Sequence, residues 1–276
     1  MSDSTTTPPG APERSGSYVL PVEDTDFLLR DEMRAIRFSL EYAKAELLLR
    51  DWGIRSTIIV FGSARVPSPE SLARDTGSAN ARAGAAVSAR ATRQAAWYQA
   101  ARDFARIASE RGGALAQHGR WRDNVIATGG GPGIMEAANR GASDAGAPTI
   151  GFNISLPEEQ HPNRYITPEL AFRFHYFAMR KMHFAMRARA LVVFPGGFGT
   201  LDELFEMLTL RQTGKGPAIP IVLYDREYWS KIVGFDAMVA EGMIKPGDLE
   251  LFGFAESPEE CWNVLVSRGL QVPRVP

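Results

Sequence analysis

The stretch 194–203 combines a glycine-rich turn with a hydroxyl group and two acids. Its sequence is Phe-Pro-Gly-Gly-Phe-Gly-Thr-Leu-Asp-Glu, and it follows the apolar run 190–193. This order predicts a buried strand, a tight turn and a helix whose first N–H groups have no partner within the helix. Such a helix start carries a partial positive charge and binds anions. Glu203, one turn into the helix, would lie beside the anion, so the pattern favours an enzyme acting on a phosphorylated small molecule.

A second turn of the same kind occupies Gly129–Gly133, after the β-prone run 124–128. One glycine-rich turn is common in α/β proteins, but two at the carboxyl ends of strands in one sheet favour a nucleotide-like ligand. Neither turn is followed by the Gly-Lys-Ser/Thr of a Walker loop, and neither has the G-x-G-x-x-G spacing of dinucleotide-binding proteins. Hydrolysis of a nucleoside triphosphate and hydride transfer are therefore disfavoured.

The pair Thr200 and Glu203 permits two interpretations. It has the form of a capping box, with Thr200 as N-cap and Glu203 at the third helical position. Residues three apart also share one helix face, about 5–6 Å from each other, so Glu203 could reach a ribose whose phosphate lies at Thr200. Asp202 is expected to face solvent, and Glu136 has a similar capping ambiguity after Gly133.

The basic pair Arg180-Lys181 lies among aromatic and methionine residues in the stretch 176–183. A basic pair on a helix is usually a solvated face, but these neighbours are unusual for a free surface. The planar guanidinium of Arg180 could bind a phosphate or hold a carboxylate in place.

Alternating strand and helix patterns predict the elements that position these residues. The expected strands lie at 57–61, 124–128, 148–152, 191–194, 219–223 and 249–252, and the expected helices at 24–52, 97–111, 134–145, 176–189, 200–213, 228–240 and 258–268. This alternation predicts an α/β fold with a doubly wound, Rossmann-like parallel sheet, helices on both faces and an extra N-terminal helix.

The domain organisation follows from composition. Residues 1–23, rich in Ser, Thr, Pro and Gly at their start, are expected to form a disordered tail, and 24–272 a single nucleotide-binding catalytic domain. The Ala/Arg-rich segment 71–93 is either a flexible insertion or a helix extension. The proline-containing loop 153–168 is long enough to cover a ligand pocket.

The overall composition excludes several classes of protein. A net charge of −1 gives no general attraction to nucleic acid or membranes. No apolar run approaches the roughly 20 residues of a membrane span, and no signal-peptide core is present, so a cytoplasmic protein is expected. Four histidines and one cysteine provide little for a metal cluster. Cys261 is interpreted as a core thiol, and neither a metal nor a cofactor is expected.

Three separated motifs resemble the Lonely-guy (LOG) family of cytokinin riboside 5′-monophosphate phosphoribohydrolases. The stretch 195–203 fits its PGGxGTxxE signature, Met179-Arg180-Lys181 fits its Arg-Lys element, and 129–139 fits its first glycine turn. The resemblance covers about residues 58–223, and the sequence is more similar to the larger bacterial branch of the family than to its short plant-like branch. The segment 71–93 and the stretch 119–123 depart from the compact family pattern.

The resemblance implies hydrolysis of the N-glycosidic bond of a purine nucleoside 5′-monophosphate, which yields a free base and ribose 5-phosphate. It implies that Arg180 and Glu203 are the catalytic pair. It also implies at least a homodimer. Substrate-binding residues are expected at Gly130, Gly131, Gly133, Glu159, Lys181, Gly196, Gly197, Gly199 and Thr200.

Other functions stay open at this point. The substrate could be plain AMP or another purine nucleotide rather than an N6-modified one. A non-catalytic carrier of a nucleotide or a molybdenum cofactor on the same fold is a second class, although a carrier would need only the phosphate loops and not both Arg180 and Glu203. Family members have also been labelled lysine decarboxylases, but no motif supports a pyridoxal Schiff base.

Overall fold

The computed structural model describes residues 16–72, 85–115, 120–155 and 161–273. The chain divides into two compact units, Met1–Lys44 and Ala45–Pro276. Most of the expected N-terminal tail and the middle of the Ala/Arg-rich segment 71–93 lie outside the described residues.

In unit 1, the helix expected over 24–52 is interrupted near its start. The Arg37 guanidinium donates hydrogen bonds to the carbonyl oxygens of Leu28, at 2.7 Å, and Arg30, at 2.6 Å. These bonds satisfy carbonyls that an interrupted helix leaves without partners, so the chain can break there. The resulting elements are η2 (Gly16–Tyr18), α1 (Thr25–Leu28), η3 (Asp31–Met33) and α2 (Arg34–Asp51), which continues into unit 2.

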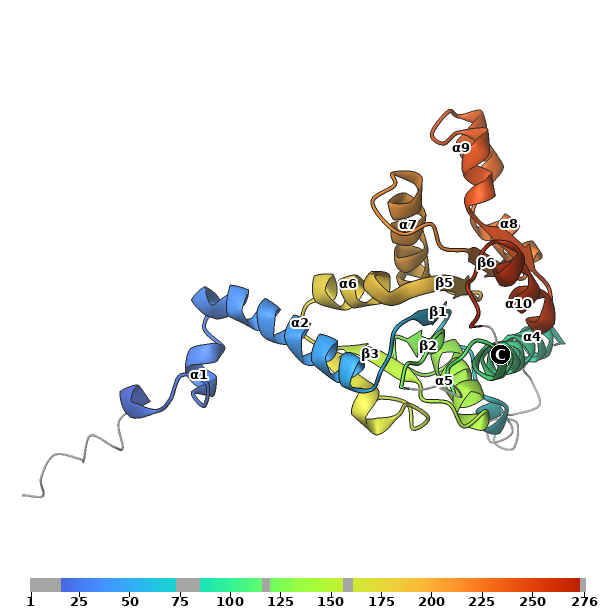
Figure 1. Ribbon diagram of the computed structural model, residues 1–276. Coiled ribbons are helices and arrows are strands. Elements are labelled where there is room, and N and C mark those ends of the chain that lie inside the picture. The colour runs from blue at the N-terminus through green and yellow to red at the C-terminus, as the bar shows by residue number, and fades with distance from the viewer. Residues whose placement is uncertain (1–15, 73–84, 116–119, 156–160, 274–276) are drawn as a thin grey trace, which may run out of the picture. The chain divides into compact units, whose positions relative to one another are not determined.

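Unit 2 contains a parallel sheet, which confirms the predicted fold class. Its seven described strands have the order β4-β3-β2-β1-β5-β6-β7, and every neighbouring pair is parallel (Figure 1). Their bounds are β1 (Thr57–Phe61), β2 (Val125–Thr128), β3 (Ile150–Ile154), β4 (Ala171–Phe174), β5 (Ala188–Val193), β6 (Ile221–Tyr224) and β7 (Gly253–Ala255).

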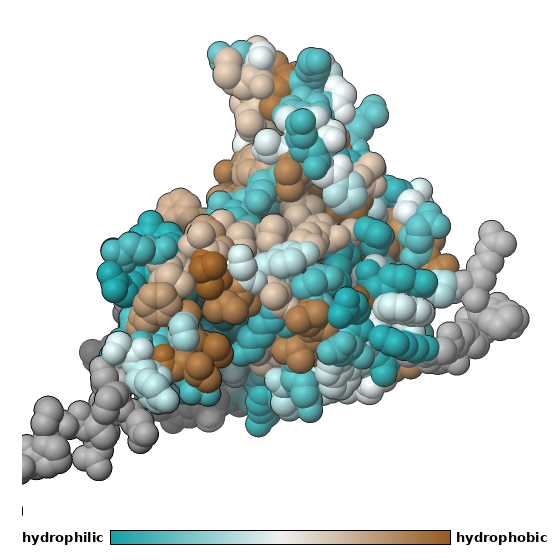
Figure 2. Space-filling model, turned by 60° about the vertical axis from the view of Figure 1, so that its left-hand side comes forward, coloured by the Kyte–Doolittle hydropathy of each residue, from teal (hydrophilic) through white to brown (hydrophobic). Residues whose placement is uncertain are grey.

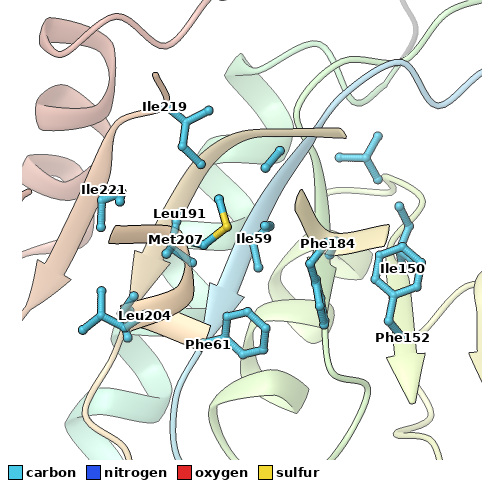
Figure 3. Packing of buried hydrophobic residues seen from close by; sticks show 14 of the residues in the cluster. Ile59, Phe61, Ile150, Phe152, Phe184, Leu191, Leu204, Met207, Ile219 and Ile221 are labelled. Atoms are coloured by element: carbon cyan, nitrogen blue, oxygen red, sulfur yellow. The ribbon is translucent and has the colours of Figure 1, made fainter. Parts of the chain in front are cut away.

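Helices cover both faces of this sheet because its central strands are apolar on both sides. In β1, Ile58 and Val60 belong to one buried cluster, and Ile59 and Phe61 belong to the other, as the two-residue period of a strand requires. The first cluster includes α4 (Ala85–Arg111), α5 (Ile134–Asp144) and α10 (Pro258–Ser267). The second, shown in Figure 3, includes α6 (Phe177–Arg187) and α7 (Phe198–Gln212).

Several elements of unit 2 differ from the sequence predictions. Strand β4 was missed because it is a short edge strand with only two buried side chains. The last strand, β7, begins at Gly253 and not at 249 as predicted. The apolar residues expected to form it lie mostly in the 3-10 helix η5 (Pro246–Leu251). The helix expected over 228–240 is two helices, α8 (Arg226–Ile232) and α9 (Phe235–Ala240), interrupted before Gly234, which is the N-cap of α9.

The strand order places the glycine-rich turns near each other. Chain connections proceed from β1 through β2 and β3 to β4 on one side, and from β5 through β6 to β7 on the other. The order therefore reverses beside β1, and ligands of such sheets bind at the carboxyl ends of the strands at this reversal. The two turns follow β2 and β5, the two neighbours of β1.

The surface mixes hydrophilic and hydrophobic residues on the face shown in Figure 2. Among the described helices, none combines the length and the apolar character that a membrane crossing needs. The Cys261 thiol is fully buried, which confirms its interpretation as a core residue.

Candidate functional site

Arg180 and Glu203 form a buried ion pair between the first turn of α6 and the second turn of α7. Arg180 Nη2 lies 3.3 Å from Glu203 Oε1, and the two side chains are only 13% and 4% exposed. The guanidinium also lies against the rings of Phe177 and Phe184, at 5.0 and 6.0 Å from their centroids. The structure thus brings together the two residues that the resemblance implies are catalytic.

Burial raises the pKa of Glu203 to about 7, against the opposing influence of the Lys181 and Arg180 charges. Removal from water disfavours the ionised carboxylate, and this effect exceeds the attraction of the two cations. Burial likewise lowers the pKa of Arg180, while the Glu203 carboxylate opposes that change. A carboxyl group that titrates near neutral pH in a buried ion pair is typical of functional sites.

Lys181 links α6 to α7 next to this pair. Its ammonium lies 2.8 Å from Asp202 Oδ2 and 2.7 Å from Glu206 Oε2. Asp202 is 55% exposed, as expected for a solvent-facing side chain, yet it is paired. The ammonium of Lys181 is therefore engaged with protein carboxylates, and its predicted contact with substrate stays a prediction.

The capping-box interpretation of Thr200 and Glu203 is wrong. Helix α7 begins at Phe198, its N-cap is Gly197, and no side chain caps it. Because the helix starts two residues earlier than predicted, Thr200 is already inside it. The Thr200 side chain is buried and lies so close to Gly196 that a Cβ atom at Gly196 would meet Thr200 Oγ1 at 2.1 Å.

The start of α7 is open in front of its free N–H groups. The first bond within the helix runs from Leu201 N to Gly197 O, at 2.9 Å, so the N–H groups of residues 198–200 precede it. A Cβ atom added to Gly197 or Gly199 would meet no atom within 4 Å. The predicted anion-binding residues of this turn are thus gathered around one helix start that a ligand can approach.

The other turn, after β2, needs glycine for its backbone conformation. Gly130 and Gly133 have φ angles of +74° and +71°, and a Cβ at Gly133 would lie 2.3 Å from the carbonyl oxygen of Ser63. Asn163, which the sequence analysis missed, donates from Nδ2 to the carbonyl oxygens of Gly130 and Gly131, at 3.2 and 3.1 Å. This contact of Asn163 could not be predicted, because the sequence does not show where its loop passes.

Ser63 joins the two glycine-rich turns. Its backbone N–H donates to the carbonyl oxygen of Pro195 at 3.0 Å, and its carbonyl oxygen accepts from Ile134 N at 3.1 Å. Tyr228 supports the turn after β5 by donating from its hydroxyl to the carbonyl oxygen of Gly196, at 2.7 Å. Neither residue was predicted as part of the site, although Ser63 comes only two positions after the end of β1.

Two further expectations concern Glu159 and the absence of a metal. Glu159 lies outside the described residues. In the described part of the chain, no group of three or more His, Cys, Asp or Glu side chains could hold a metal ion.

The chain is similar to known proteins over the part that carries the buried pair. A family described as possible lysine decarboxylase matches residues 135–265. Two cytokinin riboside 5′-monophosphate phosphoribohydrolases of Arabidopsis thaliana are 30% identical over 141 residues and 31% identical over 142 residues. Over about half of its length the chain resembles the Lonely-guy family. In each Arabidopsis comparison, the match spans 50% of this chain and 64% of the relative.

Other Lonely-guy relatives and solved structures are more distant. A probable enzyme of the same name from Oryza sativa subsp. japonica is 27% identical over 150 residues, 51% of this chain and 67% of the relative. The structure of a molybdenum cofactor binding protein from Rippkaea orientalis has a TM-score of 0.46 at 19% identity, with 77% of this chain and 97% of that chain covered. A Moco carrier protein from Chlamydomonas reinhardtii has a TM-score of 0.45 at 19% identity, with 78% and 98% covered.

Proposed function

We propose that this protein hydrolyses the N-glycosidic bond of a purine nucleoside 5′-monophosphate, with an N6-modified adenosine 5′-monophosphate as substrate. The observation that carries the proposal is the buried Arg180–Glu203 pair, in which Glu203 has a pKa of about 7. Glu203 lies on α7, the helix whose open start can accept a phosphate, and Arg180 reaches it from α6. The names of the relatives agree with this activity.

Glu203 would act on the sugar. In the overall reaction, water adds to the anomeric carbon, the bond from that carbon to the base nitrogen breaks, and the base leaves with a proton. Positive charge develops on the ribose as the bond breaks, and a fixed carboxylate stabilises it. The ionised form of Glu203 would do this through the ribose hydroxyls, or would orient the attacking water.

Arg180 would hold the Glu203 carboxylate in one orientation. Its Nη2 faces Oε1 of that carboxylate, and its position is fixed by Phe177 and Phe184. The phosphate would bind at the start of α7, where backbone N–H groups and the helix dipole favour an anion. Binding this distant group would position the sugar without taking part in the bond cleavage.

A panel of nucleotides tests the proposal. The protein is incubated with AMP, N6-prenylated AMP, GMP and CMP, and the free base is quantified by chromatography. Release from N6-prenylated AMP faster than from AMP is the expected result. Equal release from all purine nucleotides would indicate a general nucleotide nucleosidase, and binding without release from any of them would favour a carrier.

A further inference from the structure

A cavity of about 500 Å³ lies between the glycine-rich turn that follows β5 and the first described turns of α4. Pro195, Gly196 and Gly197 line it on one side, and Arg90, Arg93 and Trp97 line it on the other. Neither Arg180 nor Glu203 lines it. The arginines come from the end of the Ala/Arg-rich segment, which departs from the compact family pattern, and the structure shows that residues 85–93 extend α4.

Arg93 is held in place at this wall. Its Nη2 donates to both oxygens of Asp225, at 2.9 and 3.1 Å, and its guanidinium lies 5.2 Å from the centroid of the Trp97 ring. Asp225 also accepts from Trp97 Nε1 and from the backbone N–H of Tyr228, each at 2.8 Å. Arg93 is thus oriented by the protein, and Asp225 balances its charge.

Arg90 lies one turn before Arg93 on the same helix face. It is exposed, and no ion pair or hydrogen bond joins it to another described residue. Near the cavity, Glu227 is paired with Lys231, at 2.5 Å, and also lies 3.7 Å from Arg93 Nη2. The positive charge of Arg90 is therefore unbalanced by the described residues, and it is added to the partial positive charge of the start of α7.

We propose that Arg90 and Arg93, which lie outside the family motifs, contact the phosphate group of a sugar phosphate bound in this cavity. Guanidinium groups match phosphate oxygens with paired N–H donors. The inference rests on the proposed function for the identity of the whole substrate, a nucleoside 5′-monophosphate. Its consequence is that two arginines of α4 add to the affinity for the phosphate group.

Titration calorimetry with ribose 5-phosphate tests this inference without any turnover. Arg90→Ala is expected to weaken binding about tenfold or more, because a charge-assisted contact to the phosphate is lost. Arg106→Ala is the matched control. Arg106 lies on the same helix, 16 positions and roughly 24 Å along the axis from Arg90, and it pairs with Glu110. It should bind like the wild type.

Arg93→Gln supplies the second variant, with thermal unfolding to show that it remains folded. It should also weaken the binding of ribose 5-phosphate. Unchanged affinity in both folded variants would overturn the inference, whether or not the wild type cleaves nucleotides. Weakened binding in a protein that cleaves no nucleotide would support the phosphate site and contradict the proposed function.

Discussion

The guanidinium of Arg180 and the carboxylate of Glu203 lie 3.3 Å apart at a place where both side chains are almost completely removed from water. Such a pair is costly to bury, and the cost is visible in the pKa of Glu203, which rises to about 7. Carboxyl groups with pKa values raised in this way cluster at functional sites.

Glu203→Gln should lower kcat for base release about a thousandfold. The amide has nearly the same shape but carries no negative charge, so it cannot stabilise the cationic sugar. The measurement is the rate of base release at saturating nucleotide, with circular dichroism as the check on folding. Retention of more than a tenth of the wild-type rate would exclude Glu203 from this role.

The pH dependence should report the ionisation of Glu203. Because the carboxylate is the active form, kcat/KM should rise with pH and level off above about 7, the pKa of Glu203 in the folded protein. Measuring kcat/KM between about pH 5 and pH 9 at constant ionic strength gives the midpoint. A midpoint near the ordinary value of a glutamate, 4.5, would contradict the account.

Lys181→Met should move this midpoint to higher pH. The ammonium of Lys181 is the largest of the influences that lower the pKa of Glu203, so its removal disfavours the carboxylate. Lys181→Arg keeps the charge and the link to Asp202 and Glu206, and it should restore the wild-type midpoint. A loss of activity without any change of midpoint would indicate that Lys181 only supports the packing of α6 on α7.

Glu203→Gln should also stabilise the protein above neutral pH. The folded-state pKa of about 7 exceeds the ordinary glutamate value of 4.5, so the folded protein binds the proton more tightly than the unfolded chain. The wild type therefore loses stability as pH rises from about 4.5 to about 7. The variant lacks this loss, which is on the order of 3 kcal/mol. Urea unfolding at pH 5 and pH 8 measures the difference, and an equal gap at both values would contradict it.

Gly196→Ala should destabilise the protein by about 1–3 kcal/mol. The added methyl group would meet the buried Thr200 hydroxyl at 2.1 Å. Gly197→Ala is the matched control, since a Cβ atom there meets nothing within 4 Å. Urea unfolding compares the two, and equal stability of both variants would show that the turn adjusts to the methyl group.

The central sheet could be predicted from the sequence because its strands are continuous apolar runs. Thr57–Phe61 is buried at every position and was predicted with the same bounds. The edges were harder, because Ala171–Phe174 alternates exposed and buried residues over only four positions. An alternation of four residues cannot be distinguished from a loop by its sequence alone.

The candidate site likewise contains residues that could be predicted from the sequence and residues that could not. The motifs predicted that Arg180 and Glu203 act together, and the structure places them in contact. Residues that support the turns from other parts of the chain, such as Asn163 and Tyr228, could not be predicted, because their contacts depend on how distant segments pack. The start of α7 was misplaced because a Thr–Glu spacing does not distinguish an N-cap from the helix interior.

The most direct test of the account is the yield of both products from one substrate. Wild-type protein and Glu203→Gln are incubated with N6-prenylated AMP, and the free base and ribose 5-phosphate are quantified by mass spectrometry. The account predicts equal amounts of the two products from the wild type and almost none from the variant. Equal product formation by both proteins, or no product from a wild type that binds the nucleotide, would contradict it.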